Sequence, residues 1–340
     1  MGGVNRLHVM SVVAAAVAVA LLGVLLAGGS GLTGFFTAGT AKEKVIIAYL
    51  PVVQGLPFFL ALEKGYFAEE GLDVAAVRFD APNQIIDTVA AGQADAAATG
   101  AASGITAIAE SKKPGTLKMF AMVCGTQDRL NDELLVAANS SIGSFADLKG
   151  KKLGHLPGIQ FRTVAQYILK KNGVDPSAVQ LVDLAVPLQL GALGSGQVDA
   201  VLTLEPVGTI GVAKGVARVG VVSPMVKYVS DPWCGGTAIL SAKFMKERPE
   251  MAKRVVKVFD RAVREYELAA SKQYLVKYLG VDNKTADKVP LPLIKMYYNL
   301  TDKDFDAIQK WIDVFYEEGV IQQKVYVRKM ILSGNESASA

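Results

Sequence analysis

Arg162 and Glu205 are the side chains with the strongest chemical signal in this sequence. Arg162 and Thr163 fall in the first turn of the helix expected in "GIQFRTVAQYILKKNG", where a cation opposes the helix dipole. A planar guanidinium there suits a carboxylate or sulfonate; a solvent-exposed arginine is the equal alternative. Glu205 precedes Pro206 after a buried strand and either accepts from an amine, hydroxyl or ring N–H, or caps the next helix. Together they suit a zwitterion or a polar heterocycle with an acidic group.

The other candidate ligand contacts are residues of the loops that follow strands. Unpaired N–H groups at helix N-termini favour anions, and such termini are expected after residues 54–56, 99–100 and 157–158. The remaining candidates are Gln54, Leu56, Thr99, Gly100, Ser103, Gly158, Phe161 and Trp233. For Thr99 and Ser103 the alternative role is helix capping, and for Trp233 it is packing under a hinge.

Several classes of chemistry are not expected. His155 is the only histidine after the N-terminal apolar segment, and we interpret it as a core or rim residue. The sequence has no Gly-x-Ser-x-Gly, metal-ligand cluster or Walker-type loop, so we expect no catalytic residue, no metal, no cofactor and no enzyme. The formal net charge is +4 without a basic block or interleaved aromatic residues, which argues against a nucleic-acid partner.

A repeated phrase shows how the chain is organised. Gly-Gln-x-Asp-Ala occurs at 92–96 and again at 196–200, and each copy ends a helix and begins a buried strand. The alternation of strands and helices around both copies predicts two α/β lobes with mostly parallel sheets. Ligands bind beyond the carboxyl ends of such strands. The loops 99–103 and 203–206 should therefore line opposite walls of a cleft between the lobes.

The chain should cross between these lobes twice, outbound in 116–141 and back in 217–244. We therefore expect lobe 1 to comprise residues 44–126 and 235–330, lobe 2 to comprise 127–234, and 331–340 to form a disordered tail. If the two crossings pair as hinge strands, Cys124 and Cys234 lie near each other and a disulfide is possible. Two buried free thiols are the alternative.

Residues 1–43 should form an export segment and a linker. The run from Val9 to Gly29 carries no charge and follows a single arginine, which is typical of an export signal. Its length is also close to the ~20 residues that span a bilayer. The segment is therefore either a cleaved signal or an N-terminal anchor that contacts the membrane, and in both cases the protein is extracytoplasmic.

Four stretches together carry a family resemblance: "LPFFLALEKGYFAEEGLDV", "AAGQADAAATG", "SFADLKGKKLG" and "LGSGQVDAVLTLEP". From residue 44 to residue 326 the chain resembles the nitrate/sulfonate/taurine-type solute-binding proteins of ABC importers, a family that includes binders of thiamine-pyrimidine precursors. Gly29 stands where a lipoprotein of this kind has its lipid-bearing cysteine. The usual lipidation is therefore not expected.

The resemblance implies the two-lobed periplasmic-binding-protein fold of type 2, with two crossover hinge strands and a ligand cleft. It implies a monomer that captures a small anionic or zwitterionic solute and delivers it to ABC permease and ATPase subunits. The alternatives are a stand-alone ligand-sensing partner of a membrane receptor and a binder of pyrimidine precursors. The relatives that make the pyrimidine depend on a site histidine and a cysteine-rich motif, and this chain has no such motif.

Overall fold

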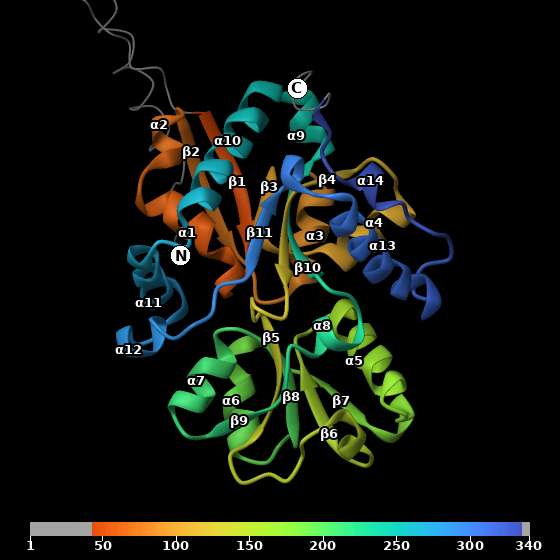
Figure 1. Cartoon of the computed structure of the whole chain (residues 1–340). Helices are drawn as coiled ribbons and strands as arrows, with labels where there is room; N and C mark the ends of the chain where they lie inside the picture. The colour runs from red at the N-terminus through yellow and green to blue at the C-terminus, as the bar shows by residue number, and fades with distance from the viewer. Residues whose placement is uncertain (1–42, 335–340) are drawn as a thin grey trace, which may run out of the picture. The chain divides into compact units, whose positions relative to one another are not determined.

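A computed structural model describes residues 43–334 (Figure 1). The predicted export segment lies outside these residues, as does the end of the predicted tail. Ile331 and Leu332, assigned to that tail from the sequence, are buried instead, and the Leu332 N–H donates to Met119 O at 2.8 Å. Within residues 43–334, no helix has both the length and the apolar character that crossing a bilayer requires.

Two mixed sheets form the centres of two lobes (Figure 1). The sheet of lobe 1 has the order β11-β4-β10-β3-β1-β2, and the sheet of lobe 2 has the order β7-β6-β8-β5-β9. The strands of lobe 1 are β1 (Glu43–Tyr49), β2 (Leu72–Arg78), β3 (Ala96–Ala102), β4 (Leu117–Gly125), β10 (Trp233–Ser241) and β11 (Leu293–Met296). The strands of lobe 2 are β5 (Asp132–Ala137), β6 (Lys152–His155), β7 (Gln180–Asp183), β8 (Ala200–Leu204) and β9 (Ala217–Val222).

Strand direction departs from the mostly parallel pattern where the chain crosses between lobes. β1, β2 and β3 run parallel in lobe 1, and β6, β7 and β8 run parallel in lobe 2, as predicted. β10 is antiparallel to both of its neighbours, and so is β5. Each of these two strands enters its sheet from the other lobe, at the carboxyl ends of the parallel strands, and therefore runs in the opposite direction.

The repeated phrase has the same structural role in both lobes. The N–H of Asp95 donates to Ile46 O, and its carboxylate accepts the N–H of Ile46 at 2.9 Å. Asp199 makes the equivalent pair with Lys152, whose N–H donates to its carboxylate at 2.8 Å. Each aspartate thus aligns the start of β3 or β8 with the neighbouring parallel strand, which explains why the phrase occurs twice.

The helices of lobe 1 cover both faces of its sheet (Figure 1). Val45 and Ile47 of β1 pack with α1, α10 and α11, whereas Ala48 belongs to the core on the other face, under α3, α4 and α13. The helices are α1 (Leu56–Glu63), α2 (Tyr66–Glu69), α3 (Pro82–Ala90), α4 (Ser103–Lys112), α9 (Ala242–Glu247), α10 (Pro249–Glu265), α11 (Gln273–Leu279), α12 (Asn283–Ala286), α13 (Asp302–Glu317) and α14 (Val327–Met330).

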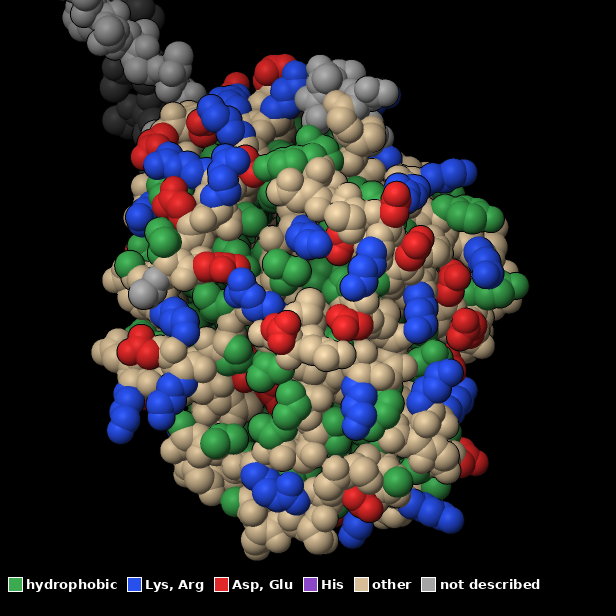
Figure 2. Space-filling view, in the orientation of Figure 1, with side chains coloured by type: hydrophobic (Ala, Val, Ile, Leu, Met, Phe, Trp, Pro, Cys, Tyr) green, Lys and Arg blue, Asp and Glu red, His purple; other side chains and the backbone are tan. Residues whose placement is uncertain are grey.

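Lobe 2 has fewer helices: α5 (Ile159–Lys171), α6 (Val186–Gly194), α7 (Val207–Ala213) and α8 (Pro224–Tyr228). Short 3-10 turns complete the chain: η1 (Val53–Gly55), η2 (Phe145–Leu148), η3 (Pro176–Ala178), η4 (Ala269–Lys272) and η5 (Tyr297–Asn299). The outward side chains of both lobes carry mixed charges. On the face shown in Figure 2, basic and acidic side chains are interspersed, and no large field of one sign covers either lobe.

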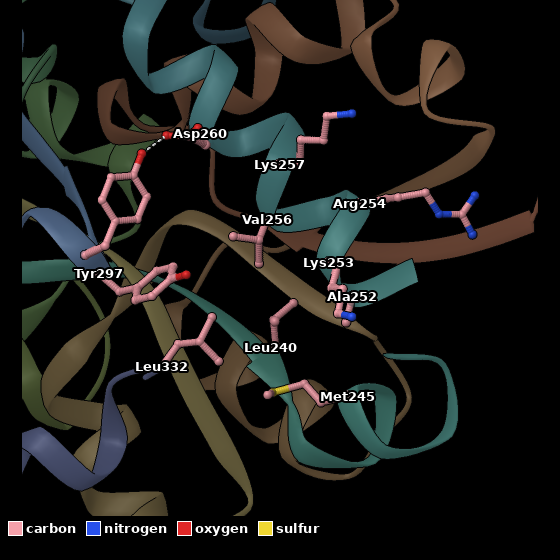
Figure 3. A pocket seen from close by; sticks show the side chains of 11 residues that line it. Leu240, Met245, Ala252, Lys253, Arg254, Val256, Lys257, Asp260, Tyr297 and Leu332 are labelled. Atoms are coloured by element: carbon pink, nitrogen blue, oxygen red, sulfur yellow. Dashed lines mark hydrogen bonds between the residues drawn. The ribbon is translucent and has the colours of Figure 1, made fainter. Parts of the chain in front are cut away.

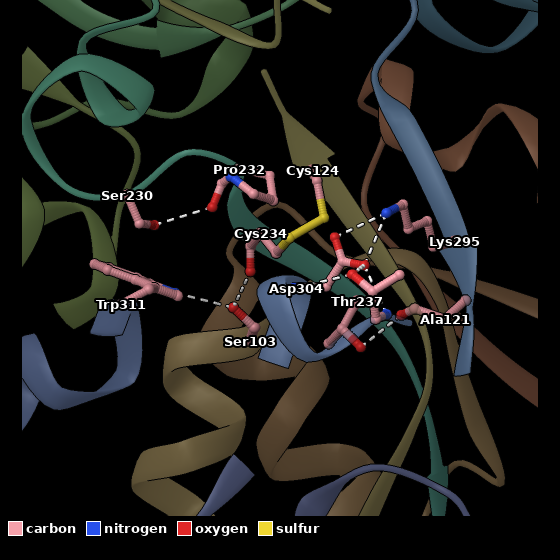
Figure 4. Close-up of a disulfide and its surroundings, with 11 residues drawn as sticks. Ser103, Ala121, Cys124, Ser230, Pro232, Cys234, Thr237, Lys295, Asp304 and Trp311 are labelled. Carbon is pink, nitrogen blue, oxygen red and sulfur yellow. Dashed lines mark hydrogen bonds and ion pairs between the residues drawn. A yellow bond between two sulfur atoms is a disulfide. The ribbon is translucent and has the colours of Figure 1, made fainter. Parts of the chain in front are cut away.

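A disulfide joins the two crossings on their lobe 1 side. β4 and β10 pair antiparallel at Gly125 and Trp233, and Cys124 is bonded to Cys234 (Figure 4). Both cysteines are fully buried. Of the two alternatives that the sequence left open, the structure has the disulfide.

Candidate ligand-binding cleft

A small cavity lies between the two lobes, at the carboxyl ends of their parallel strands. Its volume is about 20 Å³, close to the ~10–15 Å³ that one water molecule requires. Lobe 1 lines it with Leu50, Gln54, Pro82, Gly100, Ala101, Ala102, Trp233, Gly235 and Gly236. Lobe 2 lines it with Asn131, Leu156, Gln160, Phe161 and Leu204. Both walls come from strand ends, the loops that follow them and the first turns of α3 and α5, which is where ligands bind in open α/β sheets.

A wider groove of about 420 Å³ also lies between the lobes, and it shares no lining residue with the cavity. Its residues adjoin the cavity lining in sequence, since Pro51 follows Leu50 and Pro206 lies two residues after Leu204. Arg78 of lobe 1 and Lys214 of lobe 2 also line the groove. The groove and the cavity are therefore neighbouring parts of one interlobe cleft, and we call the wider part the mouth groove.

A third hollow, of about 340 Å³, lies on lobe 1 alone (Figure 3). Leu240, Met245, Val256 and Leu332 line its apolar part, with side chains of α10 along its rim. All its residues belong to one lobe, so movement of the lobes would neither open nor close it. The interlobe cavity is the better candidate for a binding site.

Two glutamines bridge the lobes across the cavity. The Gln54 amide donates to Asn131 Oδ1 at 2.6 Å. Gln160, at the start of α5, accepts the N–H of Gly104 at 2.8 Å and donates to Gly235 O at 3.1 Å. Both glutamines are buried, at 3% and 2% exposure. In this closed arrangement the cleft is thus held by neutral amide groups.

Two buried polar atoms in the cavity lining have no hydrogen-bond partner among the described residues. They are Gln54 Oε1, an acceptor, and Trp233 Nε1, a donor. The Trp233 side chain is 1% exposed and packs edge-on against Trp311 at 5.5 Å between ring centroids. It also covers Gly235, where a Cβ would lie 1.9 Å from the indole ring. Buried polar groups usually find a partner, so these two atoms make the cavity a candidate site.

The sequence-derived candidates fall into three groups. Gln54, Gly100, Phe161 and Trp233 line the cavity. Three further candidates are buried and do not line the cavity. They hydrogen-bond to residues in or beside the lining, or pack in the core. Thr99 donates to Gln54 O, Ser103 donates to Cys234 O at 2.8 Å and accepts from Trp311 at 3.1 Å (Figure 4), and Leu56 packs in the lobe 1 core.

The third group comprises lobe 2 residues outside the cavity lining. Arg162 donates to Asp183 at 2.8 Å on the protein surface. Glu205 accepts from the N–H and the hydroxyl of Thr209, at 3.1 and 2.9 Å. Thr163 is buried and its hydroxyl has no partner among the described residues, and Gly158 precedes α5 with a φ of 110°. The ligand-binding role assigned to these residues from the sequence stays a prediction.

Asn131 and Gln160 are the cavity residues that sequence reasoning missed. Gln160 lies four residues before Val164 and eight before Ile168, so it is a polar side chain on the apolar face of α5. Asn131 opens the polar run Asn-Asp-Glu directly before the apolar part of β5. A polar residue at an apolar position was the available signal in both cases.

Three carboxyl groups are buried in lobe 2 beside the cavity lining. Burial raises the pKa of Asp132 to about 7, although its carboxylate accepts the N–H of Met225 at 2.9 Å. Burial, together with the nearby Glu205, raises the pKa of Glu133 well above its usual range. Burial also raises the pKa of Glu205. These groups favour the uncharged form more than ordinary carboxyl groups do.

His155 is fully buried in lobe 2. Its Nδ1–H donates a hydrogen bond to Leu156 O at 2.8 Å, and Nδ1 lies 3.5 Å from the Asp183 carboxylate. Burial lowers the pKa of the imidazole. Its other nitrogen, Nε2, has no partner among residues 43–334. The side chain does not line the cavity, in agreement with its interpretation as a core residue.

Two lobes, two crossings and an interlobe cavity define the fold of the periplasmic solute-binding proteins. The alkanesulfonate-binding protein SsuA from Xanthomonas axonopodis pv. citri, solved bound to MOPS, has this fold with a TM-score of 0.70 at 19% identity, covering 85% of this chain and 98% of SsuA. The chain belongs to the NMT1/THI5-like family, whose model matches residues 53–274. The fold class and the resemblance inferred from the sequence are thus confirmed.

Two curated relatives differ in what their names describe. A putative aliphatic sulfonates-binding protein of Bacillus subtilis is 25% identical over 316 residues, covering 91% of each chain. The 4-amino-5-hydroxymethyl-2-methylpyrimidine phosphate synthase THI13 of Saccharomyces cerevisiae is 23% identical over 249 residues, covering 69% of this chain and 71% of the synthase. The similarity to binding proteins supports a solute-binding role for this chain.

Proposed function

We propose that this protein is an extracytoplasmic solute-binding protein that captures a small organic solute by closing its two lobes and delivers it to an ABC permease. The observation that carries the proposal is the cavity lined by both lobes, with two buried polar atoms that have no partner within residues 43–334. The Bacillus relative, which matches nearly the whole chain, bears the name of a binding protein. The export segment expected from residues 1–43 agrees with work outside the cytoplasm.

Lobe closure follows from how the chain crosses between the lobes. The connections from Gly125 to Asp132 and from Tyr228 to Trp233 are short and can act as hinges. The Cys124–Cys234 disulfide ties them together on the lobe 1 side, which leaves the motion to the segments beyond it. In the closed arrangement an ion pair between Lys170 and Glu318, at 2.6 Å, joins α5 to the end of α13. Opening the cleft must break this pair and the glutamine bridges.

The anionic or zwitterionic solute expected from the sequence depends on Arg162 and Glu205. Arg162 is paired with Asp183 and Glu205 with Thr209, both within lobe 2. A role for Arg162 therefore needs its ion pair to exchange on binding. Replacing Arg162 with alanine tests this: unchanged solute affinity removes Arg162 from the site.

A second candidate is a binder of pyrimidine precursors. It is favoured by the family match and by the yeast relative, whose name describes synthesis of a pyrimidine phosphate. A planar ring would lie against Phe161 and Trp233, which both line the cavity.

Native mass spectrometry of the full chain, purified without added solute, tests the proposal. A single additional mass that is lost on denaturation supports solute capture, and that mass separates sulfonates from pyrimidines. A bare protein that also shows no thermal shift with nitrate, sulfonates, carboxylates or pyrimidines would contradict the proposed function.

A further inference from the structure

The cavity lining carries no charge. None of the fourteen residues between the lobes that line it, all within 43–334, is a lysine, arginine, histidine, aspartate or glutamate. Its polar side chains are the three amides and the Trp233 indole. An anion placed there would lose its hydration without gaining a cationic partner, and burying an unpaired charge is strongly unfavourable.

The ionisable groups nearest to the cavity in sequence also argue against an anionic solute. Asp132 and Glu133 directly follow Asn131, and Glu205 directly follows Leu204. All three carboxyl groups are buried, at 1%, 4% and 6% exposure. Arg162 follows Phe161 but is already paired with Asp183. On the lobe 2 side, the groups beside the cavity are therefore carboxyl groups, or an arginine that is already paired with a carboxylate.

The N-terminus of α4 is also occupied from within the protein. Helix N-termini hold anions through free N–H groups, but the N–H of Gly104, in the first turn of α4, donates to Gln160 Oε1 at 2.8 Å. The oxygen of a neutral amide thus takes the place of an anion oxygen. Charged side chains between the lobes lie further out, where Arg78, Lys214 and Asp282 line the mouth groove.

What the lining does offer is one acceptor and one donor without partners. Gln54 Oε1 needs an N–H or O–H, and Trp233 Nε1 needs an oxygen or nitrogen lone pair. Both atoms belong to lobe 1, and both side chains are at least nine-tenths buried. A neutral solute that carries both a donor and an acceptor, for example in an amide, lactam, sulfonamide or amidine-like group, can satisfy both.

We propose that the solute is uncharged and binds through such a paired donor and acceptor, with its N–H or O–H on Gln54 and its acceptor on Trp233. This inference rests on the proposed function, since it assigns the chemistry of the solute to the same cleft. It separates this chain from binding proteins whose solute is an anion. The cavity of about 20 Å³ has room for about one water molecule, so the solute must hold the lobes further apart than they lie here. Apolar contacts then come from Leu50, Leu156 and Phe161, so the rest of the solute is apolar or aromatic.

Matched pairs of small molecules that differ in charge but hardly in size test the inference. The probes are methanesulfonate with methanesulfonamide and benzoate with benzamide, titrated calorimetrically into the full chain near pH 7. The uncharged member of a pair should bind at least about tenfold more tightly. Its affinity should also stay constant between roughly 50 and 500 mM salt, because no ion pair forms.

Two variants connect the result to the cavity. Trp233→Phe keeps the aromatic ring and removes the N–H, and it should weaken binding of the uncharged probes by roughly three- to tenfold. Its melting temperature should fall, because the smaller ring leaves a gap against Trp311, so the titrations are made at a temperature where the variant is fully folded. Arg162→Ala tests the ionic alternative, and an uncharged solute requires that this variant leave the same affinities unchanged.

The outcomes separate the inference from the proposed function. Tighter binding of the anionic members, or loss of binding in Arg162→Ala alone, overturns the uncharged solute and leaves solute capture intact. An unchanged affinity in Trp233→Phe overturns the assigned donor. No binding by any pair, together with no co-purified mass, overturns both proposals.

Discussion

Asp132 offers a sharp test of the electrostatics of lobe 2. It is the first residue of β5, fully buried, and one carboxylate oxygen accepts the N–H of Met225, while the other has no partner among the described residues. Replacement by asparagine keeps an oxygen for Met225 and removes the ionisable group. Comparing Asp132→Asn with the wild type at two pH values therefore isolates the effect of ionisation.

The sign and size of this effect follow from the raised pKa of Asp132. Below about pH 4 the carboxyl group is protonated in both the folded and the unfolded chain, and stability does not depend on it. Between about pH 4 and pH 7 only the unfolded chain loses the proton, because burial raises the folded pKa from 3.8 to about 7. Each pH unit in this window lowers the free energy of unfolding by about 1.4 kcal/mol. From pH 5 to pH 8, the ionisation of Asp132 should therefore lower the free energy of unfolding by about 3 kcal/mol.

The assay is urea unfolding at pH 5 and at pH 8, followed by tryptophan fluorescence. The stability advantage of Asp132→Asn should be about 3 kcal/mol larger at pH 8 than at pH 5. Any fixed effect of the amide cancels in this difference. Asp147→Asn is the control: hydrogen bonds from Gly143 and Ser144 lower the pKa of this exposed carboxyl group, so it stays ionised at both pH values. Parallel losses of stability in Asp132→Asn and the wild type would refute the reasoning.

Three further predictions concern the hinge and the cleft. Cys234→Ser should lower the free energy of unfolding by about 2–4 kcal/mol, because the disulfide closes a loop of 110 residues; chemical denaturation measures it, and equal stability of the reduced wild type and variant checks the assignment. Gln160→Leu removes both hydrogen bonds to lobe 1, so small-angle scattering should show a larger radius of gyration, and an unchanged radius would contradict its bridging role. Gly235→Ala places a Cβ 1.9 Å from the Trp233 ring and should lower stability by more than about 2 kcal/mol. Gly143→Ala, with open space around it, should change stability by less than about 0.5 kcal/mol, and thermal melts that rank these two variants alike would argue against this packing.

The sequence predicted the fold because the fold depends on local patterns that occur twice. Gly92 and Gly196 end helices with positive φ angles of 70° and 74°, and the aspartate three residues after each aligns the next strand. These features act over a few residues of the chain and can therefore be recognised in the amino-acid sequence. The antiparallel direction of β5 and β10 was not predicted, because it depends on which lobe each strand enters from.

The cavity was only partly predictable, for a different physical reason. Gln54 and Trp233 could be proposed from their loops, since a polar or aromatic residue at a strand end has few structural uses. The sequence shows Gln160 only as a polar residue on the apolar face of α5. Its partners could not be predicted, because Gly104 and Gly235 lie 56 and 75 residues away and meet it only when the lobes close. Arg162 drew attention by its charge, yet its partner Asp183 stands in the same lobe, 21 residues further along.

The contrast between Arg162 and Gln160 bears on how such clefts should be interpreted. Arg162 has its ionic partner Asp183 in its own lobe, and this pair stays at the surface, where both groups keep their hydration. A neutral amide loses less on burial and can both donate and accept, so it can enter the interface and exchange partners when the lobes move. The residues best suited to sense a solute in this cleft are therefore its amides. The charged residues lie at the rim of the cleft.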